Sequence, residues 1–139
     1  MKHLPWVSAL FVVLALSQMS LAQDFCFQPS NTKQQAVWSE TAIGTYQLIA
    51  GVASKRIFVC SAVATGYGTN LSVDFEAGNS GCTAVTEGFG ELLYLPYTTV
   101  SVGGGSSTQF TVPTGDSLCI FAAGEAPFLN TGWVTYVQK

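Results

Sequence analysis

The residues with the clearest capacity for chemistry are four cysteines, Cys26, Cys60, Cys82 and Cys119, which are spread along the chain. An even number of widely spaced cysteines is typical of disulfide bonds in a protein that folds in an oxidising compartment. The spacing contains no Cys-x-x-Cys pair, and His3 is the only histidine, so the usual ligands of a zinc site are missing. We therefore expect two disulfides and no metal.

The sequence alone leaves all three pairings of these cysteines open. Cys60 and Cys119 each lie in a strongly apolar segment. Cys26 is close to the start of the expected mature chain, and Cys82 is in a loop rich in Gly, Asn and Ser. This placement favours one bridge between the two cysteines in apolar segments and another between the loop and the N-terminal segment.

The mature chain is expected to contain few side chains that could act in catalysis. His3 lies in a segment that we expect to be removed, so the mature chain lacks the base of the common serine and cysteine hydrolases. Carboxylates can hydrolyse glycosides or bind calcium. The candidates are Asp24, Glu40, Asp74, Glu76, Glu87, Glu91, Asp116 and Glu125. Most fall in expected turns or on polar strand faces, where they keep an apolar protein soluble, so we predict no enzymatic activity and no cofactor.

Aromatic side chains offer a different chemistry, because an exposed flat ring can stack on a sugar. Most aromatic residues in β-sheets instead fill a core or an interface. We name Tyr67, Tyr94 and Tyr97 as a candidate ligand platform. Tyr67, between two glycines at an expected loop tip, is the best candidate for an exposed ring, while Trp38 and Trp133 are further members of the candidate set.

The N-terminus has the pattern of a secretory signal over residues 1–22. Lys2 supplies a basic start, Val7–Leu16 is an apolar run, and Ser20–Ala22 offers small residues for cleavage. The run is shorter than the roughly 20 residues that span a bilayer. With a net charge of −3 and only 9% charged residues, the chain also lacks the positive charge that binds the phosphates of nucleic acid. We expect a mature domain, residues 23–139, that is secreted, periplasmic or at the cell surface and free of the membrane.

The chain from Ala36 onward is predicted to be all-β, because short segments rich in Val, Ile, Phe, Tyr and Thr alternate with Gly, Asn, Ser and Pro. We predict a single antiparallel β-sandwich, jelly-roll-like, with about eight short strands. They are Ala36–Glu40, Thr45–Ala50, Arg56–Thr65, Asn70–Ala77, Leu92–Thr98, Thr108–Val112, Ser117–Ala122 and Gly132–Gln138. Gly66–Gly68 is expected to close a hairpin, and Pro113–Asp116 a tight turn.

Two segments indicate how the strands are covered. In Leu71–Ala77, apolar residues alternate with Ser72, Asp74 and Glu76, which predicts one face on the core and one in water. Ile57–Ala64 is apolar at both alternating sets of positions, which predicts either a central strand covered on both faces or a strand with one face against another subunit.

Several short motifs, in this order along the chain, carry a resemblance to a known group. They are Tyr46–Ala50, Lys55–Cys60, Val73–Phe75, Cys82, Ser117–Cys119 and Gly132–Val137. The chain resembles small disulfide-containing β-sandwich proteins of tailed phages and bacteria, a group associated with virion surfaces and decoration. The resemblance implies a structural or adhesive subunit that assembles through sheet faces or edges, with a trimer as one form of assembly.

Together these features predict a secreted, non-catalytic structural or interaction protein that acts through surface loops or self-association. The alternative is a carbohydrate-binding module that uses exposed aromatic residues on a cell-surface or glycan partner. Composition and motifs do not identify the ligand.

Overall fold

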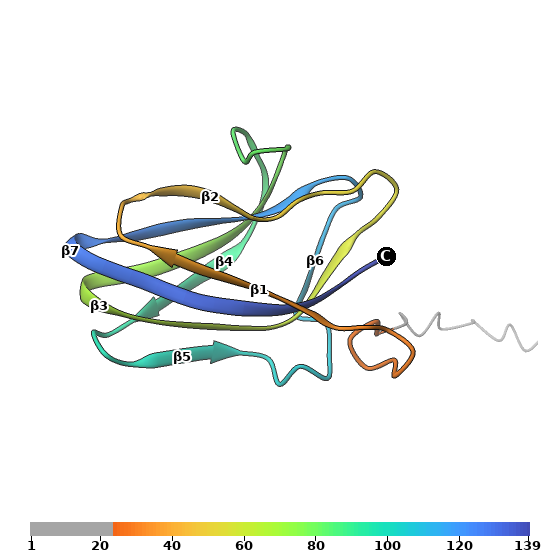
Figure 1. Ribbon diagram of the computed structural model, residues 1–139, viewed down its shortest axis with the longest axis horizontal. Coiled ribbons are helices and arrows are strands. Elements are labelled where there is room, and N and C mark those ends of the chain that lie inside the picture. Colours follow the sequence, from red (N-terminus) through yellow and green to blue (C-terminus); the bar gives the residue numbers. More distant parts are fainter. Residues whose placement is uncertain (1–23) are drawn as a thin grey trace, which may run out of the picture.

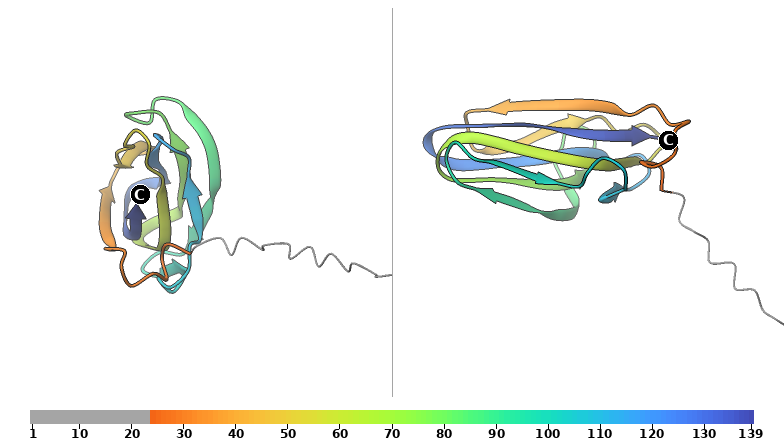
Figure 2. Two further views of the ribbon diagram at one scale, coloured as in Figure 1. Left: turned by 90° about the vertical axis from the view of Figure 1, so that its right-hand side faces the viewer. Right: turned by 90° about the horizontal axis from the view of Figure 1, so that it is seen from below.

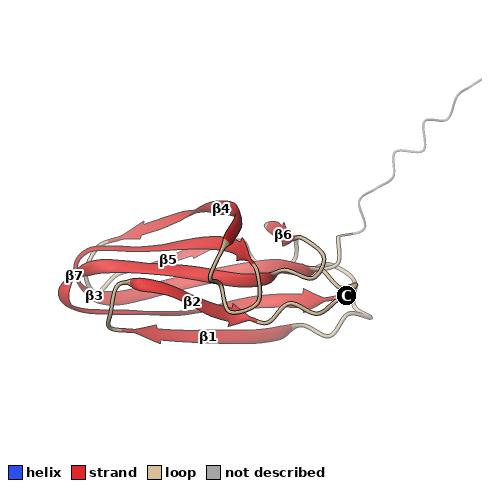
Figure 3. Cartoon of the chain, turned by 90° about the horizontal axis from the view of Figure 1, so that it is seen from above, coloured by secondary structure: helices blue, strands red, loops and turns tan. Residues whose placement is uncertain are grey.

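The computed structural model describes residues 24–139, so the predicted signal segment lies outside the described residues. The secondary structure of the described residues consists of seven antiparallel strands (Figures 1 and 3). They are β1 (Gln34–Glu40), β2 (Gly44–Ile49), β3 (Ile57–Gly78), β4 (Val85–Tyr94), β5 (Thr99–Val102), β6 (Phe110–Val112) and β7 (Ser117–Gln138). No helix in this part of the chain is long and apolar enough to cross a membrane. The predicted all-β fold class is confirmed, with seven strands in place of about eight.

The two longest strands, β3 and β7, have 22 residues each and pair antiparallel along their full length. The pairing runs from Ile57 opposite Gln138 to Gly78 opposite Ser117, with irregular register between Tyr67 and Ser72. At this irregularity both strands bend, and the two-stranded ribbon folds back over itself (Figure 1). The bend lies at the end of the molecule opposite the C-terminus (Figure 1).

This folding produces two layers that face each other (Figure 2). Layer A contains β1, the C-terminal half of β7, the N-terminal half of β3, and then β5 and β6. Layer B contains β2, the N-terminal half of β7, the C-terminal half of β3, and β4. The other five strands extend these layers by pairing with one of the two long strands.

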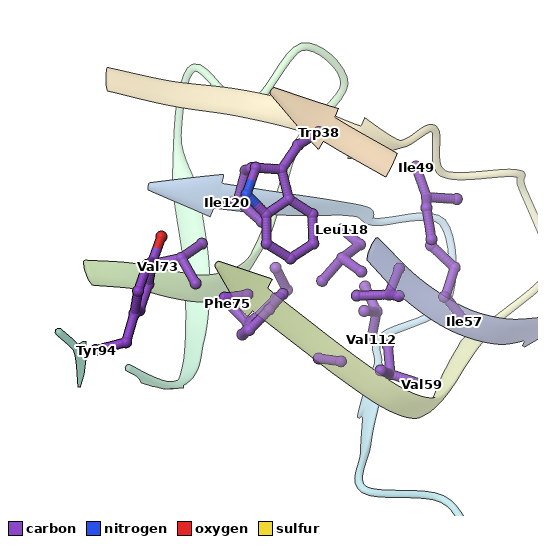
Figure 4. Close-up of a cluster of buried hydrophobic side chains, with 14 of the residues drawn as sticks. Trp38, Ile49, Ile57, Val59, Val73, Phe75, Tyr94, Val112, Leu118 and Ile120 are labelled. Carbon is purple, nitrogen blue, oxygen red and sulfur yellow. The ribbon is translucent and has the colours of Figure 1, made fainter. Parts of the chain in front are cut away.

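The hydrophobic core fills the space between the layers (Figure 4). Phe75 of layer B meets the Trp38 ring of layer A edge-on, with 5.9 Å between the ring centroids. Leu71, Val73 and Phe75 are all buried, as their alternation predicts. The apolar stretch at the start of β3 is central, because β7 flanks it on one side and β5 and β6 on the other.

A small polar network crosses this core. The indole Nε1 of Trp38 donates to Oδ1 of Asn130 at 2.9 Å, and Nδ2 of Asn130 donates to the carbonyl oxygen of Ser72 at 2.6 Å. Asn130 is fully buried, and Ser72, which we predicted on the solvent face, is buried too. The network links strands of both layers, so the amide fixes how the layers sit on each other.

The disulfides are Cys26–Cys60 and Cys82–Cys119, so the pairing favoured from the sequence was wrong. Cys119 lies between Leu118 and Ile120, which point into the core, so its side chain points to the outside of layer B, under the β3–β4 loop. Cys60 belongs to a separate cluster in which the N-terminal segment covers β3. Both cysteines are buried, but by different covering segments, and burial alone does not identify the covering segment.

The predicted hairpin at Gly66–Gly68 was also wrong, because the predicted strands on either side of it join in one strand, β3, which begins at Ile57. These glycines allow the bend. A Cβ on Gly66 would lie 2.0 Å from the carbonyl oxygen of Leu129, and Gly68 has a φ of +118°. In the same way, Ser117–Ala122 and Gly132–Gln138 join in β7, where a cis peptide links Ala126 to Pro127. The predicted turn at Pro113–Asp116 is present, with the Asp116 N–H donating to the Pro113 carbonyl.

The predicted strand Leu92–Thr98 was wrong in its bounds. β4 begins at Val85 and ends at Tyr94, and a turn separates it from β5. The first half of β4 was missed because Gly88 and Gly90 interrupt its apolar pattern. This half is an edge strand with two register shifts, where glycine is better tolerated than in a central strand.

Replacing Asn130 with Ala is expected to lower the free energy of unfolding by about 2–4 kcal/mol, because the indole N–H loses its buried partner. Urea unfolding measures the change. Ser39→Ala on the exposed face of β1 is the control and should stay within about 0.5 kcal/mol of wild type. A comparable loss in both variants would contradict the role given to the network.

Each disulfide closes a loop of similar length, with cysteines separated by 34 and 37 residues. Chain-entropy considerations give about 4 kcal/mol for each bridge. Cys26→Ala with Cys60→Ala, and Cys82→Ala with Cys119→Ala, should each lower the free energy of unfolding by about that amount in denaturant titrations. A loss below about 1 kcal/mol from either pair would show that the bridge does not constrain the unfolded chain as expected.

Candidate functional site

Two of the three tyrosines named from the sequence lie together at the bent end of the molecule. Tyr67 is in the β3 bend and Tyr97 is in the β4–β5 turn. Their ring centroids are 6.5 Å apart and their planes differ by 18°, so the rings are nearly parallel. Tyr97 is 85% exposed and Tyr67 is 39% exposed.

Tyr94, the third tyrosine of the predicted platform, is buried and not exposed beside this pair, although it lines the neighbouring groove. It is only 7% exposed and packs in the core at the end of β4 (Figure 4). Burial raises the pKa of its phenol to about 12, so the group stays protonated at physiological pH. Its hydroxyl has no hydrogen-bond partner among the described residues.

Backbone and side-chain hydrogen bonds hold the β4–β5 turn against the bend. The N–H of Tyr97 donates to the carbonyl of Gly66 at 2.8 Å, and Oγ1 of Thr65 donates to the carbonyl of Thr98 at 2.9 Å. Within the turn, the N–H of Thr98 donates to the carbonyl of Leu95 at 3.1 Å. Tyr97 itself has a φ of +59°, a left-handed conformation that directs the chain back into β5. The exposed ring of Tyr97 therefore projects from an anchored turn.

A groove of about 580 Å³ lies beside the tyrosine pair, between the β3 bend and the β4–β5 turn. Asn70 lines the groove, and its side-chain amide donates to the carboxylate of Glu125. Oγ1 of Thr69 donates to the other oxygen of Glu125 at 2.7 Å. The groove thus combines mostly apolar walls with amide and hydroxyl groups at the edge, a composition common in binding sites.

Large apolar side chains are exposed around the groove. Leu93 and Leu95 are both exposed and alternate with Tyr97 along the chain. We call Tyr67, Leu93, Leu95 and Tyr97 the tip cluster. Contiguous exposed apolar groups of this kind mark interaction sites more often than isolated ones do.

The carboxylates form no comparable site. Asp74 of β3 lies directly opposite Glu91 of β4, on the outer face of layer B. Partial burial, and then the charge of Glu91, raise the pKa of Asp74, while partial burial and the charge of Asp74 raise the pKa of Glu76. Within residues 24–139, no three side chains of His, Cys, Asp or Glu are grouped as metal ligands.

Comparisons with known proteins add little. No family model matches the chain, and no curated protein matches it. Among solved structures, it is similar to the cryo-EM structure of the virus-like particle of extra small virus (XSV) of the giant freshwater prawn Macrobrachium rosenbergii. The two chains share 16% sequence identity, the match covers 78% of this chain and 79% of that chain, and the TM-score is 0.27. A TM-score this low does not establish a common fold.

Asp74→Asn is expected to raise the free energy of unfolding at pH 7 by about 0.2–1 kcal/mol, the range of an exposed cross-strand pair. The raised pKa of Asp74 means that the folded state binds its proton more tightly than the unfolded chain does. The charge penalty is therefore fully present above the folded pKa and disappears as the pH falls through it. Thermal melts should show a gain that shrinks toward pH 4. Glu87→Gln, exposed on β4 opposite Ala77, is the control, and a gain independent of pH would contradict the explanation.

Proposed function

We propose that the protein is a secreted, non-catalytic structural or interaction protein that acts through the tip cluster, and that it self-associates there. The exposed Leu93, Leu95 and Tyr97 carry this proposal. They lie at the end of β4 and in the anchored β4–β5 turn, at the end of the molecule opposite the C-terminus, where the ends of the domain do not obstruct a partner (Figure 1). Burying such a group against a second copy is favourable by about 25 cal/mol for each Å² of apolar surface removed from water.

The disulfides support the proposed compartment. Two bridges account for all four cysteines, which fits folding in an oxidising, extracellular or periplasmic environment. The secretory signal predicted over residues 1–22 supplies the route to that environment.

The strand order supports a more specific fold type. Taking the halves of the long strands separately, one layer has the order β1, β7, β3, β5/β6 and the other has β2, β7, β3, β4. Consecutive segments alternate between the layers, except that β4 pairs with the preceding half of β3 and that β5 and β6 share a layer, in the manner of a double-sheet jelly roll. This architecture occurs in viral capsid and lectin domains, so it is compatible both with assembly and with ligand binding, and the function has to be argued from the site.

Carbohydrate binding is the second candidate function. The observation that favours it is the nearly parallel Tyr67–Tyr97 pair beside a groove lined by Asn70, whose amide donates to the Glu125 carboxylate. A sugar ring can stack on the exposed Tyr97 while its hydroxyls reach these polar groups. This function does not require self-association, so a monomeric protein is compatible with it.

Self-association through the tip cluster predicts a discrete oligomer in native mass spectrometry and sedimentation velocity of the oxidised protein. Leu93→Ser combined with Leu95→Ser should shift it to monomer by removing apolar surface from the interface. Val85→Ser is the matched control, since Val85 is exposed on the same strand but at its far end. A wild-type protein that stays monomeric at high concentration would disprove self-association.

A further inference from the structure

The outer face of layer A is a second surface with an unusual composition. Successive residues of a strand point to opposite faces, so the neighbours of the buried Trp38, Val134 and Ala64 point away from the core. Strand register places Val37 opposite Trp133, and Trp133 opposite Val63, in one row across β1, β7 and β3. Figure 2 (right) shows these strands side by side from below.

This row is apolar and accessible. Val37 is 70% exposed and Trp133 is 37% exposed. The rows on either side of it, across β1, β7, β3 and β5, contain only Ser, Thr and Gln side chains. Over these described strands the outer face of layer A therefore carries no charge, although the whole chain has a net charge of −3.

The same face continues into the tip cluster. Val63, Thr65 and Tyr67 are every second residue along this part of β3, so their side chains share one face. The Tyr67–Tyr97 pair therefore lies on the same face as the Trp133 row, nearer to the bend. Tyr67 lies four positions along β3 from Val63 of the Trp133 row, which is about 13 Å at the usual rise of a strand. At the other end the N-terminal segment covers the face, with Phe25 stacked on Phe58 at 4.2 Å. The result is a track whose rows on the strands carry no charge, closed at one end and open at the tip, where Thr69 and Asn70 hold the Glu125 carboxylate. Aromatic rings lie along the track.

We propose that this track, from Trp133 to Tyr97, binds a neutral polysaccharide. Such a polymer has apolar C–H faces on its rings, which stack on aromatic side chains, and hydroxyl groups, which hydrogen-bond to Ser, Thr and Gln. A charged polymer finds no counter-charge on the track. A protein partner fits less well, because protein interfaces are depleted in Ser and enriched in several aromatic or Arg anchors.

The proposal rests on the interaction role given above but not on self-association. It assigns the carbohydrate candidate a specific ligand class and extends its site from the tip cluster to the sheet. Because the track lies mainly on paired strands, its side chains are held in position before binding.

The test uses the full-length oxidised protein in pull-down assays with microcrystalline cellulose and chitin, and in affinity electrophoresis with soluble xyloglucan. Alginate is the anionic comparison. We expect retention by at least one neutral polysaccharide, unchanged in 1 M NaCl because no charges take part. Trp133→Ala and Tyr97→Ala should each weaken binding about tenfold or more, as loss of a central aromatic contact does.

Val85→Ala, exposed on β4 of layer B, is the control and should bind like wild type. Val37→Asp places a charge in the central row at a highly exposed position, so it should lose binding while its melting curve stays close to that of wild type. This variant decides the question if Trp133→Ala does not fold. Leu93→Ser with Leu95→Ser should still bind polysaccharide, which separates this proposal from self-association.

Absence of retention by all three neutral polymers, or retention by alginate alone, would overturn the proposal. Wild-type affinity in both Trp133→Ala and Val37→Asp would also overturn it, and would confine any binding by Tyr97 to the tip cluster.

Discussion

The full-length pairing of β3 with β7 is the constraint on which every other element depends. The other strands attach to this ribbon, and the core exists only because the ribbon folds back on itself. Both layers share the same two strands, so neither can form a complete sheet without bringing the other into register. The hydrogen bonds of Asn130 to Trp38 and Ser72 then fix the two layers face to face.

Much of this fold could be predicted from alternation. The buried face of Leu71–Ala77 and the central position of Ile57–Ala64 follow directly from which positions are apolar. The bend could not be predicted, because glycine serves equally in a hairpin turn and where two backbones approach closely, as Gly66 and Leu129 do. The disulfide pairing failed for a related reason, since a buried cysteine gives no sign of which segment covers it.

The candidate site, like the fold, could be predicted only in part from the sequence. The sequence indicated Tyr67 because it lies between two glycines, but it placed Tyr97 in a strand and could not show that the two rings are nearly parallel. Tyr94 was named as a platform residue although it is buried, because only its position in the strand alternation separates it from the exposed Leu93. The outward position of Trp133 depends on the register among β1, β7 and β3, which are distant in sequence.

The Cys26–Cys60 bridge also determines how the domain carries a mechanical load. A pull between residue 24 and the C-terminus passes from Cys26 straight into β3 at Cys60. From there it enters the adjacent end of β7, where the backbones of Arg56 and Lys139 exchange hydrogen bonds. The segment between Cys26 and Cys60, which includes β1 and β2, therefore bears no tension. Tension is thus confined to the closed end of the molecule, and the tip cluster at the other end keeps its geometry while the chain is pulled.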